Sequence, residues 1–227
     1  MSTLSDPTRF TRTALGGSMI GSGVLGLAAA VVWPAMKSDD AAQLAVIAQH
    51  PSRFYLCTIL ILASSMLLVP ALIGLMRLSA ERSPRLTNIG GTLSIFGALV
   101  AVGDSMTQLV TWQMVGHGAD RAQMAALLHR FDNVAGATLV FSLGGIAIVV
   151  GMVLLSLALY RSRAVPAWAV AGLVAGTLVE MVGFMAPSVG VLIVGSVVML
   201  VPLCWIGWRT LASETPAHGF ELAPSST

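Results

Sequence analysis

Two carboxylates occur inside long apolar runs, where charged groups are rare. Asp104 lies in the run that ends at Trp112, and Glu180 lies shortly before Met185. A charged carboxylate in hydrocarbon costs several kcal/mol, so each side chain should face protein or water, or be protonated. Gln108 follows Asp104 by about one helical turn and extends a polar stripe along the same face. Residues of these types at this spacing can bind a proton, a cation or a small polar solute.

The same acids also have a purely structural interpretation. A neutral carboxyl group that hydrogen-bonds to a neighbouring helix fixes the register of the two helices without any ligand. Glu180 continues the helix face of Gly172 and Gly176, whose small side chains allow another helix to pack closely. Gly17 and Gly21 form a similar pair near the N-terminus. The sequence leaves both interpretations open.

The histidines lie outside the apolar runs. His117 occurs in the connector that follows Trp112, and His129 and Asp132 come later in the same connector. If this segment folds back over the bundle, it forms a lid above a polar cavity. Metal sites need converging ligands at fixed local spacing, such as H-E-x-x-H, and this sequence has no such motif. We therefore expect no metal, and we expect His129 to cover the end of a connector helix.

Several other kinds of chemistry lack their residues. No histidine or lysine lies within an apolar run, which argues against a haem held between helices and against a retinal Schiff base. The sequence has no G-x-S-x-G, P-loop or C-x-x-C motif. We expect no cofactor and do not favour an enzyme. The one enzymatic alternative is an intramembrane metal-dependent enzyme that uses the outer histidines and aspartates.

Composition indicates a membrane protein. Hydrophobic residues make up 56% of the 227 residues and charged residues only 10%, whereas soluble domains are about 25% charged. Runs long enough to cross a hydrocarbon core of ~30 Å predict transmembrane helices. The sequence thus predicts an all-α, six-transmembrane-helix bundle in the domain 14–210, between a tail at 1–13 and a disordered tail at 211–227. The predicted spans are 14–33, 54–76, 89–112, 134–159, 166–185 and 189–208.

The distribution of basic residues predicts the orientation in the membrane. With the N-terminus in the cytoplasm, the inner segments contain Arg9, Arg12, Arg77, Arg82, Arg85, Arg161, Arg163 and Arg209. The outer segments then contain only Lys37, Arg53, Arg121 and Arg130. Both termini are therefore expected in the cytoplasm of a bacterial-type cell, with the bundle in its cytoplasmic membrane. A formal net charge of +2 gives no reason to expect nucleic-acid binding.

An internal repeat indicates that the bundle consists of three pseudo-repeated helical hairpins. The segment 15–19 (LGGSM) matches 89–93 (IGGTL), and the connector 40–47 (DAAQLAVI) matches 120–127 (DRAQMAAL). The third hairpin matches less well and has only a short outer turn at Pro187. The aligned segments suggest an insertion near His117 in the second hairpin.

The two matching connectors predict short outer amphipathic helices. Asp40 with Gln43, and Asp120 with Gln123, fit a D-x-x-Q form of the capping box, in which the carboxylate binds early backbone N–H groups. Asp40 and Asp120 are therefore expected to be structural N-caps rather than ligand-binding groups.

Two further classes of function follow from these patterns. The leading hypothesis is a protein that binds or transports a small polar solute or ion, with or without proton coupling, through an outward-facing polar cavity with Asp104, Gln108, Glu180 and His117. The alternative is a structural or assembly subunit, in which the glycine faces dock a partner membrane subunit or a second copy of the chain. In either case the lipid bilayer is the surrounding partner.

Overall fold

The computed structural model describes residues 7–34, 39–116, 120–186 and 188–212. Within these ranges every regular element is a helix, and six of the helices are long and apolar enough to cross a membrane. Two further helices are short. The predicted fold class, an all-α bundle of six transmembrane helices with two short connecting helices, is confirmed.

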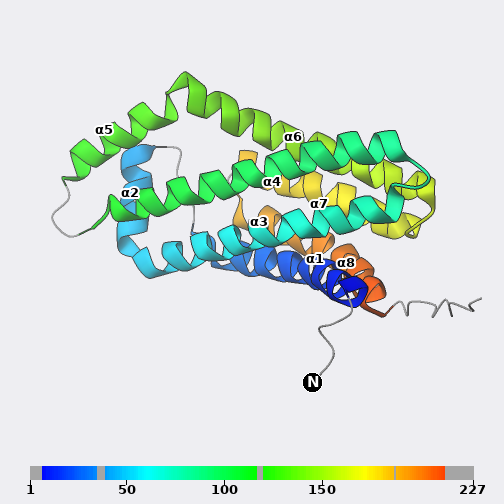
Figure 1. Cartoon of the computed structure of the whole chain (residues 1–227). Coiled ribbons are helices and arrows are strands. Elements are labelled where there is room, and N and C mark those ends of the chain that lie inside the picture. The colour runs from blue at the N-terminus through cyan, green and yellow to red at the C-terminus, as the bar shows by residue number, and fades with distance from the viewer. Residues whose placement is uncertain (1–6, 35–38, 117–119, 187, 213–227) are drawn as a thin grey trace, which may run out of the picture.

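The helices extend beyond the predicted apolar spans. For example, the first helix begins at Pro7 rather than near residue 14, because hydropathy locates the apolar centre of a helix and not its polar end turns. The long helices are α1 (Pro7–Val32), α3 (Pro51–Ser79), α4 (Pro84–Gln113), α6 (Ala135–Ser162), α7 (Ala167–Met185) and α8 (Val189–Ala212) (Figure 1). The short helices are α2 (Asp40–Gln49) and α5 (Arg121–Asp132).

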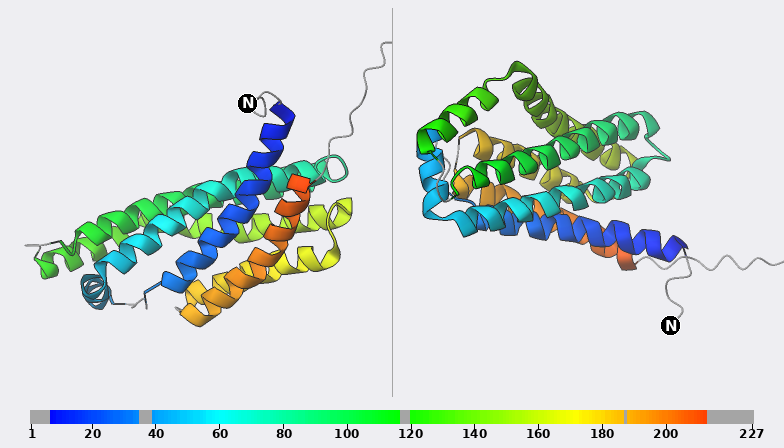
Figure 2. Two further views of the ribbon diagram at one scale, coloured as in Figure 1. Left: turned by 90° about the horizontal axis from the view of Figure 1, so that it is seen from below. Right: turned by 60° about the vertical axis from the view of Figure 1, so that its left-hand side comes forward.

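Consecutive long helices pair as hairpins. The most extensive contacts join α4 to α6, α1 to α3, and α7 to α8. Contacts of α1 with α8, of α3 with α4, and of α6 with α7 close these hairpins into a ring (Figure 2). The contact between α6 and α7 is much smaller than those within the hairpins. In this ring α4 and α7 are not adjacent.

The bundle has two different ends. At one end, here called the connector end, α2 and α5 contact each other across the chain's first two hairpins (Figure 1). At the other, here called the terminal end, α1 begins and α8 ends. All long helices run between these two ends, so each residue's place along its helix gives its depth in the bundle.

The buried apolar side chains form two clusters. The larger cluster joins all six long helices through residues such as Met19, Leu75 and Leu159. The smaller cluster lies nearer the connector end and includes Trp33, Cys57 and Leu192. Many large apolar side chains remain exposed on the outside of the bundle, which is the surface that a bilayer would cover.

Glycines allow the closest helix contacts, notably between α4 and α6. A Cβ added at Gly97 would lie 2.7 Å from the carbonyl oxygen of Gly144, and one at Gly90 would lie 3.0 Å from that of Gly151. Both pairs are spaced by two helical turns, so they form one continuous glycine seam. This close approach is the typical way in which membrane helices gain van der Waals contact.

The N-caps of the short helices correct one prediction. Asp120 caps α5 as predicted, because its Oδ1 accepts hydrogen bonds from the N–H groups of Ala122 at 2.9 Å and Gln123 at 3.4 Å. The prediction for Asp40 was wrong, since Asp39 is the N-cap of α2. Its carboxylate accepts from Ala42 N at 2.8 Å, and its carbonyl accepts the first helical bond, from Gln43 N. Asp40 is the first residue of the helix.

Arginines satisfy carbonyl groups at the ends of two long helices. Arg53 of α3 donates to the carbonyl oxygens of Val32, at 2.8 Å, and Trp33, at 3.2 Å. Arg82 donates to the carbonyl oxygen of Ser162 at 2.9 Å. Helix C-termini leave such carbonyls without intrahelical partners, so these two arginines have structural roles.

Candidate functional site: a central cavity

A partly open cavity of about 220 Å³ lies among the long helices, and all six of them contribute to its lining. Its walls include residues of both apolar clusters, and most of its surface is apolar. Among the described residues that line it, Glu180 is the only ionisable one. The other polar lining residues are Ser22, Ser64, Ser65 and Ser196. The space greatly exceeds the roughly 10–15 Å³ that one water molecule needs.

Glu180 is positioned by the hairpin of α7 and α8. The hydroxyl group of Ser196 donates to Oε1 of Glu180 at 2.7 Å. The neighbouring Gly195 makes room for the acid, because a Cβ there would lie 2.7 Å from Cγ of Glu180 and 2.7 Å from its backbone nitrogen. One carboxylate oxygen is thus held by α8, and the side chain reaches the cavity.

Serines of α1 and α3 form a polar patch in the cavity wall. The Ser64 hydroxyl donates to the carbonyl oxygen of Ser22 at 2.8 Å, which links α3 to α1. Ser65 is buried beside it and also lines the cavity. The cavity therefore offers hydroxyl groups from α1, α3 and α8 together with one carboxyl group.

Two aromatic rings line the cavity near the connector end. Trp33, which follows α1, and Phe184, in the last turn of α7, make an edge contact with ring centroids 5.5 Å apart. Both helices end at the connector end. The pair therefore stands between the space around Glu180 and that end of the bundle.

Asp104 and Gln108 form a separate polar cluster between α3 and α4. The side-chain amide of Gln108 donates to Oδ2 of Asp104 at 2.7 Å, and Thr58 of α3 lies 3.5 Å from Oε1 of Gln108. Neither Asp104 nor Gln108 lines the cavity, but Ala101 does. Ala101 is three residues before Asp104 on the same helix face, or ~4.5 Å along the axis. The cluster thus lies next to the cavity, toward the connector end.

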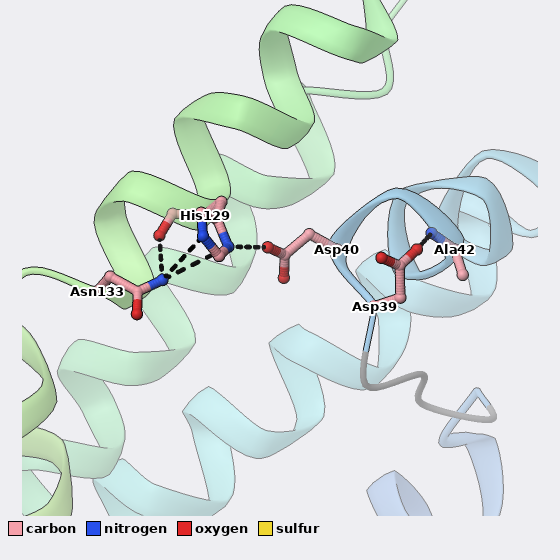
Figure 3. Close-up of polar contacts among 5 residues, drawn as sticks. All are labelled: Asp39, Asp40, Ala42, His129 and Asn133. Atoms are coloured by element: carbon pink, nitrogen blue, oxygen red, sulfur yellow. Dashed lines mark hydrogen bonds and ion pairs between the residues drawn. The ribbon is translucent and has the colours of Figure 1, made fainter.

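The predicted lid residues have different outcomes. His117 lies outside the described residues, and Asp132 is the last residue of α5. His129 lies in the last turn of α5, and its Nδ1 lies 3.0 Å from Oδ2 of Asp40 in α2 and 3.4 Å from the side-chain nitrogen of Asn133, the residue that follows the helix (Figure 3). Asn133 is the C-cap of α5, and its side chain donates to the carbonyl of His129 at 2.7 Å.

Metal ligands do not gather in the part of the chain that the structure describes. Within residues 7–34, 39–116, 120–186 and 188–212, no three histidine, cysteine, aspartate or glutamate side chains come together as a metal site requires.

The predicted glycine faces lie in different surroundings. Gly176 packs on α8, where an added Cβ would lie 2.8 Å from Met199 N, and Gly172 lies against Pro202 of the same helix. An added Cβ at Gly21 would meet Leu67 of α3, whereas one at Gly17 would meet nothing within 4 Å. Gly16 of α1 approaches the backbone of α8, where an added Cβ would lie 2.8 Å from the carbonyl oxygen of Gly207. The chain's own α8 therefore fills the groove on α7.

Sequence reasoning missed the serines and Gly195. A signal for Ser196 was nevertheless present: it lies sixteen residues after Glu180 across a short turn, a spacing that puts the two at similar depth in an antiparallel hairpin. The serines of α1 and α3 carry no comparable signal, because many membrane-helix serines bond only to their own backbone.

This fold and cavity define a polytopic membrane protein with a six-helix core and an internal carboxyl group. Residues 14–210 match the family model described as "Domain of unknown function (DUF4386)", and the chain belongs to this family. A search of curated proteins gave no match. A search of solved structures gave none either.

Proposed function

We propose that this protein binds a small solute in the central cavity and transports it across the membrane, with Glu180 as the residue that recognises its charge. The supporting observation is that Glu180 is the only ionisable residue among the described cavity-lining residues. An isolated charge in an apolar cavity is costly. The carboxyl group is therefore most stable with either a proton or a bound cation, and exchange between the two would couple solute to protons.

The lining indicates the chemical class of the solute. Its walls are mainly apolar, with one carboxyl group and a few hydroxyl groups. A small organic ammonium ion matches this lining, because its alkyl part contacts the apolar walls and its nitrogen pairs with Glu180. Sites of this kind typically combine apolar walls with few polar groups that set orientation. An inorganic ion would leave most of the apolar wall without a partner.

Asp104 and Gln108 have a different role in this proposal. They stand beside the cavity toward the connector end, which the arginine distribution favours as the outer side of the membrane. Their polar groups would attract a cation and guide it past Trp33 and Phe184. Asp104 would thus affect the rate of entry more than the affinity.

The assembly-subunit alternative depends on free glycine grooves. On α7 that groove is filled by α8, where Gly176 meets Met199. On α1, a Cβ added at Gly17 would meet nothing within 4 Å, so α1 rather than α7 is the helix that leaves a glycine open to a partner.

A binding experiment tests the proposal. Purified protein in lipid nanodiscs is titrated with n-butylammonium and, as a neutral probe of equal length, with n-butanol, and binding is followed as thermal stabilisation. We expect stabilisation by the ammonium ion and at least about thirtyfold weaker binding in Glu180→Gln, since truncating one partner of a buried charge pair costs about 2–5 kcal/mol.

Asp104→Asn is the matched control, because it removes a membrane carboxylate that does not line the cavity. The affinity of this variant for n-butylammonium should stay within about threefold of that of the wild type. Equal binding of n-butylammonium by Glu180→Gln and the wild type contradicts the proposal. So does a result in which neither probe stabilises the wild type. Size-exclusion profiles and melting temperatures without probe show whether each variant is folded.

A further inference from the structure

A second cavity lies at the terminal end, between the ends of α1, α3 and α8. It has a volume of about 470 Å³ and is lined by Thr11, Arg12, Leu15, Gly74, Arg77, Leu78 and Thr210. Two arginines, two threonines and two leucines therefore line one groove. This groove contributes no residue to the central cavity, so it is independent of the function proposed above.

We propose that this groove binds the headgroup of an anionic phospholipid. Arginine presents paired N–H donors that match the oxygens of a phosphate group. Basic pockets between membrane helices commonly hold anionic lipid headgroups. Leu78 is exposed on the outside of the bundle, so an acyl chain of the same lipid can lie along it.

The surrounding charges favour an anion. The terminal end carries Arg9, Arg12, Arg77, Arg82, Arg85, Arg161, Arg163 and Arg209, and Glu81 is its one acidic residue among those that the structure describes. Other arginines at this end have structural roles: Arg82 binds the carbonyl of Ser162, and Arg209 stacks over Trp205 at 4.9 Å. Arg77 has no hydrogen-bond or ion-pair partner among the described residues and borders the groove.

Arginines near helix ends also reach toward headgroups in general, without any specific site. A general attraction depends on the number of charges at the membrane surface and not on where they stand. A groove site depends on Arg12 and Arg77 in particular. This difference gives the proposal a matched control: Arg85 and Arg161 stand at the same end, and neither lines the groove.

Native mass spectrometry of the full-length protein measures the proposed binding directly. Protein in detergent is titrated with phosphatidylglycerol and, separately, with phosphatidylcholine of the same acyl chains. We expect one tightly retained phosphatidylglycerol per chain and weaker retention of phosphatidylcholine. Each of Arg12→Gln and Arg77→Gln should weaken phosphatidylglycerol binding about fivefold, and the double variant about twenty-five-fold.

The control pair Arg85→Gln with Arg161→Gln should change the affinity less than twofold. An equal loss in the control pair overturns the proposal, because only the total charge would then matter. Displacement of the lipid by millimolar inorganic phosphate also overturns it, because the groove would then be a site for free anions. Arg12→Lys with Arg77→Lys, which keeps both charges, shows whether a loss in the glutamine variants arises from misfolding.

Discussion

Nδ1 of His129 lies 3.0 Å from Oδ2 of Asp40, and this contact joins the two short helices that cover the connector end (Figure 3). The two residues are 89 positions apart in the chain. One belongs to the connector of the first hairpin and the other to that of the second. The pair therefore ties the first two hairpins together at the end where Trp33 and Phe184 border the central cavity.

The His129–Asp40 contact should contribute little to global stability. Side-chain exposures of 72% and 27% leave it well solvated, and exposed pairs are worth about 0.2–1 kcal/mol. A double-mutant cycle with His129→Gln and Asp40→Asn should give a coupling energy in that range. Spin labels on α2 and α5 should show a broader distance distribution in the double variant. An unchanged distribution would mean that the contact does not hold the two helices together.

The corrected N-cap of α2 predicts different effects for two adjacent aspartates. Loss of an N-cap carboxylate typically costs about 1 kcal/mol of helix stability. Asp39→Ala should therefore speed hydrogen exchange at the amide of Ala42, its partner at 2.8 Å, whereas Asp40→Ala should leave that amide nearly unchanged. Faster exchange in Asp40→Ala alone would restore the assignment that the D-x-x-Q spacing suggested.

The glycine seam between α4 and α6 should tolerate no side chain. Gly97→Val places atoms against the backbone of Gly144, and overpacking of this kind costs about 1–3 kcal/mol or more. We expect a clear fall in melting temperature in detergent. Gly103→Val is the control on the same helix, since an added Cβ there meets nothing within 4 Å. Equal melting temperatures for the two variants would show that the seam is not tightly packed.

The space beside Glu180 gives a prediction about binding. Gly195→Ala would put a methyl group 2.7 Å from Cγ of Glu180 and should displace the carboxyl group from the cavity. We expect n-butylammonium to bind at least several-fold more weakly. Gly190→Ala on the same helix has open space around it and should bind like the wild type. If both variants bind like the wild type, the position of Glu180 is not what determines affinity.

The number of membrane spans was predictable because a bilayer imposes a minimum length of apolar helix. The ends of the helices were less predictable, since Pro7 and the polar first turns of α1 carry no apolar signal. The choice between Asp39 and Asp40 illustrates a finer limit. Adjacent aspartates are both good N-caps, and the deciding factor is the residue whose carbonyl accepts the first helical hydrogen bond.

The two membrane carboxylates were found from the sequence, but their positions relative to each other were not. Asp104 and Glu180 were both expected beneath one outer opening, and their helices proved not to be adjacent in the ring. Which face of a helix points inward depends on contacts such as those of Gly97 in α4 with α6 and of Gly176 in α7 with α8. Those contacts link residues far apart in the chain, so no local spacing reveals them.

The most direct test of the central claim is carbodiimide labelling of the membrane carboxylates, measured by mass spectrometry of peptides. Dicyclohexylcarbodiimide modifies protonated carboxyl groups in apolar surroundings. If Glu180 binds the solute's ammonium group, n-butylammonium should protect Glu180 from labelling in a concentration-dependent way, and n-butanol should not. Labelling of Glu180 that is unchanged at saturating n-butylammonium would contradict the account.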